Sequence, residues 1–105
     1  MIGIGYIHHW AVILDHRVPG GKNFISGLVY EHPNFRDGTL IHTSTIVGAE
    51  GRNVVTRSGS CYTLEGAPDE GWLKVCLGEN PRFNLDNPFP NLSEVPCKTN
   101  NNDVE

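Results

Sequence analysis

Of the residue pairs in this sequence, His42 and Ser44 have the spacing that most resembles a catalytic motif. A His-x-Ser pair on a strand shares one face, as a histidine acting on a bound phosphoester requires, but such chemistry uses two copies of the motif. No second copy occurs at a suitable distance. His32 and Asp37 could complete a small phosphoesterase or a metal-dependent hydrolase. A strand whose polar residues face solvent accounts for these residue types more simply.

Five histidines invite a metal-site hypothesis, but their spacing gives it little support. His8 and His9 are adjacent and would point to opposite faces of a strand. Neither a His-x-His nor a His-Glu-x-x-His motif is present. The cysteines Cys61, Cys76 and Cys97 are widely spaced, without a Cys-x-x-Cys pair. We therefore expect no metal, no cofactor and three reduced thiols, with Cys61 and Cys76 in the core and Cys97 exposed.

A polar and aromatic loop, HPNFRDG over residues 32–38, is the best candidate for a binding site. An exposed aromatic ring beside an arginine suits a nucleobase, a phosphate or a partner's acidic patch. In the opposite interpretation Phe35 folds inward as a loop anchor and Arg36 pairs with Asp37, and both interpretations stay open. The predicted binding residues, in the loop and at nearby strand ends, are Tyr30, His32, Phe35, Arg36, Asp37, His42, Thr43 and Arg57.

Short segments rich in β-branched and aromatic residues alternate with glycine-containing turns from Gly27 to Leu64. This alternation is typical of antiparallel strands joined by tight turns. Gly27, inside a strand segment, predicts a bulge or a close backbone approach. Together with the N-terminal apolar segment, the pattern predicts strands over residues 6–14, 24–32, 40–47, 53–57 and 60–64.

The chain changes character after Leu64. Asp69 is a candidate N-cap and Gly78 a candidate stop for a short helix near 69–77, and a sixth strand over 72–77 is the competing interpretation. Four prolines, at positions 81, 88, 90 and 96, disfavour regular structure beyond it. We expect residues 79–96 to form an irregular strap, held across the sheet by Phe83, Leu85, Phe89 and Leu92, and residues 100–105 to form a disordered tail.

These elements predict a mainly β fold in a single domain over residues 1–99. The expected architecture is one small antiparallel sheet of five or six strands, curled into a partial barrel. A net charge of −4 with eight scattered Lys and Arg residues argues against non-specific nucleic-acid binding. No apolar run of about 20 residues is present, and the N-terminus lacks a signal peptide's basic start. We therefore expect a cytoplasmic protein that does not bind membranes.

One string of turn and strand residues carries a family resemblance. Residues 32–47 read HPxFxDGTxIxTSxIV, and TRSG at 56–59 and YxL at 62–64 follow. This pattern, about a third of the chain, resembles a small β-rich family of uncharacterised bacterial and phage or prophage proteins. The resemblance implies a prokaryotic or viral setting, within the bacterial cytoplasm, and says little about chemistry. By analogy, small phage proteins often block a host defence protein or sequester a small signal.

The sequence therefore favours a non-catalytic binding protein, of phage or prophage origin. Its partner would be a host defence protein or a small nucleotide-like ligand, bound through the 32–43 region. One alternative is the hydrolase built on His42, Ser44, His32 and Asp37. Another is a structural module whose exposed sheet edge pairs with a copy of itself to form a homo-oligomer.

Overall fold

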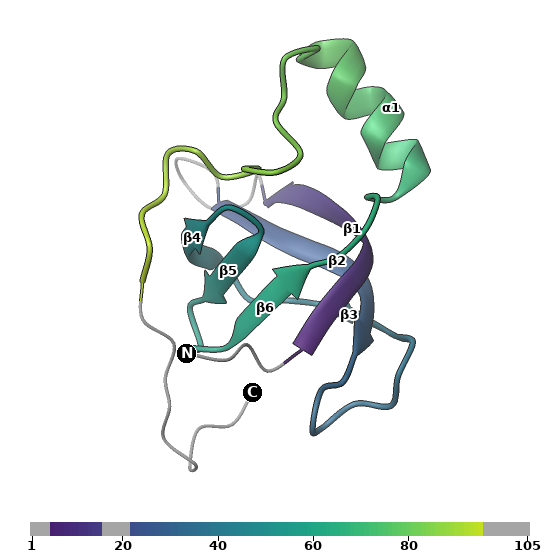
Figure 1. The fold of residues 1–105 in the computed structure, drawn as a ribbon, viewed down its shortest axis with the longest axis vertical. Coiled ribbons are helices and arrows are strands. Elements are labelled where there is room, and N and C mark those ends of the chain that lie inside the picture. Colours follow the sequence, from purple (N-terminus) through teal and green to yellow (C-terminus); the bar gives the residue numbers. More distant parts are fainter. Residues whose placement is uncertain (1–4, 16–21, 96–105) are drawn as a thin grey trace.

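A computed structural model describes residues 5–15 and 22–95 and shows a mainly β fold with one short helix (Figure 1). The predicted fold class is confirmed, and residues 72–77 are helical rather than a sixth strand. The predicted tail over 100–105 lies outside the described residues. The elements are β1 (Gly5–Asp15), β2 (Lys22–Tyr30), β3 (Thr39–His42), β4 (Ile46–Glu50), β5 (Asn53–Thr56), β6 (Cys61–Leu64) and α1 (Glu70–Glu79).

All six strands belong to one sheet, in the order β3-β2-β1-β6-β5-β4. Every neighbouring pair is antiparallel except β1 and β6, which run parallel. The sheet is therefore mixed, whereas the sequence analysis predicted a purely antiparallel sheet. The sheet curls until β2 also contacts β4, but it does not close into a barrel. An open seam is left between the edge strand β3 and the other half of the sheet, which consists of β6, β5 and β4.

The predicted third strand, residues 40–47, is two strands separated by a corner at 43–45. The corner carries the chain from one edge of the sheet, β3, to the other edge, β4. Thr43 holds it in place: its backbone N–H donates to the Ile25 carbonyl (2.8 Å), and its Oγ1 accepts from the Ile25 N–H (2.9 Å). The same hydroxyl donates to the Ser44 carbonyl (2.8 Å). A side chain therefore replaces one backbone partner at the point where the strand leaves the ladder.

Thr43→Val is expected to lower the free energy of unfolding by about 2 kcal/mol, because it leaves the part-buried Ile25 N–H without its acceptor. Thr43→Ser keeps the hydroxyl and is the matched control. Urea unfolding of the two variants measures the difference. Equal stability of the valine and serine variants would show that the hydroxyl does not hold the corner.

The core lies inside the curl of the sheet and is closed by the strap. Trp10 is fully buried, and Phe89 from the strap joins the same cluster. Leu85 and Leu92 pack against that cluster, and Phe83 meets the ring of Trp72 edge-on at 5.7 Å. The predicted anchors Leu85, Phe89 and Leu92 are therefore confirmed, whereas Phe83 packs on helix α1 and not on the sheet. In Figure 1 the strap descends from α1 past β4, where the Ala49 N–H donates to the Ser93 carbonyl (3.0 Å).

Helix α1 begins at the predicted cap, since the Asp69 carboxylate accepts from the Trp72 N–H (2.9 Å). It continues through Gly78 and ends at Glu79, so the predicted stop is slightly early. Trp72 attaches the helix to the body by packing on Trp10, with the rings 5.5 Å apart. Within the described residues, no helix has the length and apolar character needed to cross a membrane.

The cysteines differ from the expectation of three reduced thiols. Cys61, at the start of β6, is buried and disulfide-bonded, whereas Cys76 on α1 is a free thiol. The remaining cysteine of the sequence, Cys97, lies outside the described residues. Partial burial, and to a lesser degree the Glu79 carboxylate, raises the pKa of the Cys76 thiol, so it is a poor nucleophile near neutral pH.

Candidate ligand-binding cleft

Local hydrogen bonds hold the 31–38 loop in place. The Asp37 carboxylate accepts from the Glu31 N–H (2.9 Å), and the Gly38 N–H donates to the Val29 carbonyl (2.8 Å). His32 Nδ1 accepts from the Asn34 N–H (2.9 Å). Asp37 therefore shapes the turn, and within the described residues it forms no ion pair with Arg36, which is exposed.

His32 is buried at the base of the loop, with only 5% of its surface exposed. Its ring lies 4.6 Å from the ring of Phe35 and 5.9 Å from that of Tyr62. Because Nδ1 accepts a hydrogen bond, it carries no proton in this arrangement. Phe35 is half-buried and packs against the core cluster. Phe35 thus folds inward and anchors the loop, while one side of its ring remains available for contact with a ligand.

That available side of Phe35 borders a cleft of about 200 Å³ at the open seam of the sheet. The edge strand β3 and the corner form one wall, and the β5–β6 hairpin forms the other. Rings and an aliphatic chain alternate with hydroxyl groups over its surface. The lining residues are Phe35, Ile41, His42, Thr43, Ser44, Thr56, Ser58 and Tyr62.

A network of hydroxyl groups joins the two walls. Ser58 Oγ hydrogen-bonds with Thr56 Oγ1 (2.9 Å) and, more weakly, with Ser60 Oγ and Ser44 Oγ (both 3.4 Å). Thr56 and Ser60 are buried, and Thr56 Oγ1 also accepts from the Ser60 N–H (3.2 Å). Each hydroxyl can either donate or accept, so the network can rearrange to serve a polar ligand.

The structure brings only some of the predicted binding residues together at this cleft. Phe35, His42 and Thr43 line the cleft, although the Thr43 hydroxyl is engaged in holding the corner. Tyr30 lies elsewhere, against His8 at a ring distance of 4.7 Å on the outer face of the sheet. Arg57 is exposed beside the cleft, and its backbone N–H donates to the Thr45 carbonyl (2.7 Å).

Sequence reasoning missed the contribution of Thr56, Ser58 and Tyr62 to this cleft. In the sequence, residues 56–60 indicate only a hairpin connection. A sequence signal for the hydroxyl groups is nevertheless present, because the turn sequence TRSGS, residues 56–60, contains three hydroxyl-bearing residues. What the sequence could not show is that the 43–45 corner brings Ser44 to the same place.

No protein-family model, curated protein or solved structure matches this chain. The resemblance to a family of bacterial and phage proteins therefore stays a prediction.

The residues of the predicted hydrolase are only partly brought together. His42 and Ser44 both line the cleft. His32 lies beneath Phe35 with Nδ1 engaged, and Asp37 is committed to the Glu31 N–H. Over residues 5–15 and 22–95, no three His, Cys, Asp or Glu side chains gather in a way that could hold a metal ion.

Proposed function

We propose that this protein is a non-catalytic binding protein and that the cleft at the open seam takes a small nucleotide-like ligand. The observation that carries the proposal is the convergence of aromatic rings and hydroxyl groups on one concave surface. Phe35 and Tyr62 supply the rings, and Ser44, Thr56 and Ser58 supply the hydroxyls. Pockets of this composition, largely apolar with a few convergent polar groups, are typical small-molecule sites.

The size of the cleft suggests how such a ligand would bind. A volume of about 200 Å³ accommodates one planar ring system rather than a complete nucleotide. The base would pack against Phe35, and the hydroxyls would bind its polar edge. Arg36 and Arg57 are exposed and adjacent in sequence to lining residues. A guanidinium group matches phosphate geometry, so these two arginines are the candidates to meet the phosphate outside the cleft.

Sequestration of a small signal by a phage or prophage protein is the setting we favour, on the resemblance of residues 32–64 alone. Structural disulfides are rare in the bacterial cytoplasm. The disulfide at Cys61 therefore counts against the cytoplasmic part of that setting.

Titration with adenosine and guanosine 5′-monophosphate, followed by calorimetry, tests the proposed ligand class. We expect binding, and we expect the double variant Ser44→Ala, Ser58→Ala to weaken it about thirtyfold, since two hydrogen bonds are lost and each is worth about 1 kcal/mol. Ser93→Ala, an exposed serine on the strap, is the control. Absence of binding to both nucleotides, or equal affinity in the double variant, would overturn the proposal.

A host protein is the second candidate partner, and the outer face of β1, β2 and β3 favours it. A groove of about 480 Å³ runs over this face. It is lined by the apolar side chains of Ile13, Leu28 and Leu40 and also by the polar residues His9, Ser26 and Asp69. Leu40 is 63% exposed beside the half-buried Ile13 and Leu28, and a contiguous exposed apolar patch usually marks an interaction surface.

Leu40→Glu tests the second candidate. Val75→Glu is the matched control, because Val75 on α1 is equally exposed at 63% but lies on a different element. We expect a host protein captured by the wild type and by the Val75 variant to be lost from the Leu40 variant. Equal capture by both variants would remove the outer face as the docking surface.

A further inference from the structure

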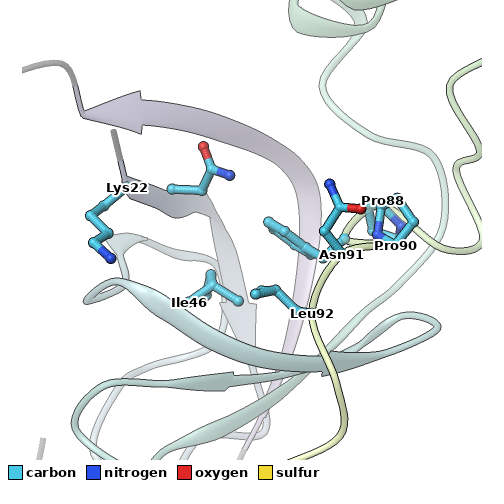
Figure 2. Close-up of a pocket in the computed structure, with 8 residues that line it drawn as sticks. Lys22, Ile46, Pro88, Pro90, Asn91 and Leu92 are labelled. Carbon is cyan, nitrogen blue, oxygen red and sulfur yellow. The ribbon is translucent and has the colours of Figure 1, made fainter. Parts of the chain in front are cut away.

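A second cleft, of about 270 Å³, lies between the strap and the first residues of β2 and β4. It shares no lining residue with the cleft at the open seam. Figure 2 shows Lys22 on one side and Pro88, Pro90 and Asn91 on the other, with Ile46 and Leu92 between them. Phe89 and Asn23 complete the lining.

The floor of this second cleft is apolar and already ordered. Phe89 and Ile46 are each 5% exposed, and Leu92 packs against the core cluster. Pro88 and Pro90 restrict the backbone on both sides of Phe89, and the Leu92 N–H donates to the Phe89 carbonyl (3.1 Å). A ligand therefore meets a preformed surface and does not have to order the strap, which lowers the entropic cost of binding.

Among the described residues that line this cleft, Lys22 alone carries a charge. Lys22 contributes an ammonium group, and Asn23 and Asn91 contribute carboxamides. Among the described residues, none of these three side chains forms an ion pair or a hydrogen bond. An ammonium group pairs best with an anionic oxygen, and carboxamide N–H groups can donate to the same anion or to a neighbouring amide.

We propose that the second cleft binds a small apolar molecule through its carboxylate. The apolar body would lie on Phe89 and Leu92, and the carboxylate would face Lys22. The volume is slightly below that of sites for drug-sized ligands, so the body is one ring or one branched aliphatic chain. Two sources supply this chemistry: a free acid, and the C-terminal residue of a peptide. In the second case Asn23 and Asn91 would bind the preceding peptide group.

N-acetyl-leucine, as a probe in calorimetry or in NMR titration, tests the site. We expect it to bind the wild type, and we expect Lys22→Gln to weaken binding at least tenfold. Lys74→Gln, on the exposed face of α1, is the control and should leave the affinity unchanged. The uncharged probe N-acetyl-leucinamide should bind at least tenfold more weakly than the acid, because it offers no anion to Lys22.

Comparison with the peptide Gly-Gly-Leu, with a free C-terminus, separates the two sources. Tighter binding of the peptide than of N-acetyl-leucine identifies a protein C-terminus as the natural ligand, and equal binding identifies a free acid. The proposal is overturned if neither probe binds at millimolar concentration, if acid and amide bind equally, or if Lys22→Gln has no effect. None of these results depends on nucleotide binding at the other cleft.

Discussion

Arg52→Ala is expected to lower the free energy of unfolding by about 3 kcal/mol, although the residue lies in a surface turn. Its Nε donates to the Leu85 carbonyl (3.2 Å), and one terminal nitrogen donates to the carbonyls of Gly66 (2.8 Å) and Leu64 (3.4 Å). The guanidinium carbon also lies 5.6 Å from the ring of Trp10. Truncation would leave three carbonyls without their charged donor and would uncover the central tryptophan.

The ion pair with Asp86 contributes little to this effect. The two groups are 3.5 Å apart, but the Asp86 side chain is 88% exposed, and exposed pairs are worth less than about 1 kcal/mol. The carbonyl contacts matter more because they join the β4–β5 turn to the β6–α1 connection and to the strap. Arg52→Lys should recover only part of the loss, since an ammonium group cannot reproduce the planar fork that reaches separate carbonyls.

Urea unfolding of Arg52→Ala, Arg52→Lys and Arg82→Ala measures the prediction. Arg82 is exposed on the strap, so its loss should change stability by no more than about 0.5 kcal/mol. If Arg52→Ala is as stable as Arg82→Ala, the guanidinium does not hold the three segments together.

The fold class could be predicted from the sequence because most of its determinants are local. Apolar alternation and glycine turns located the strands, Asp69 marked the helix start, and Phe89 marked the strap's anchor. The break at 43–45 was hidden, since the alternation of side chains continues through it. Parallel pairing of β1 with β6 was hidden as well, because it follows from the path of the chain across the sheet.

The candidate site was harder to predict because side-chain direction in a loop is set by distant contacts. Phe35 turns inward because its ring meets His32, which in turn stacks on Tyr62. The hydroxyl network joins Ser44 to Ser58 only because the corner and the hairpin meet at the seam. The structural role of Arg52 could not be predicted from the sequence, since each carbonyl that it binds lies more than ten residues away.

Gly27→Ala is the second substitution with a large expected effect, a loss of about 3 kcal/mol in the free energy of unfolding. A Cβ at this position would overlap Cγ2 of Ile7 and would lie 2.9 Å from the His8 carbonyl oxygen and 3.2 Å from Cα of Trp10. Two of these atoms are backbone, so a rotamer change cannot relieve the overlap. The register of β1 shifts between His8 and Ala11, and His9 has a positive φ of 51° at that bulge.

The bulge gives this prediction a sharp test, because the β1 backbone can approach β2 so closely only opposite a glycine. Gly78→Ala on α1 is the matched control: a Cβ added there would meet no neighbouring side chain within 4 Å, and removal of a helical glycine should stabilise the protein by up to about 1 kcal/mol. The same substitution is thus expected to lower the free energy of unfolding at Gly27 and to raise it at Gly78. Amide NMR shifts should change around His9 in Gly27→Ala alone. Wild-type stability of Gly27→Ala would mean that β1 and β2 can separate at the bulge without cost, and the close approach would then not be what sets the register.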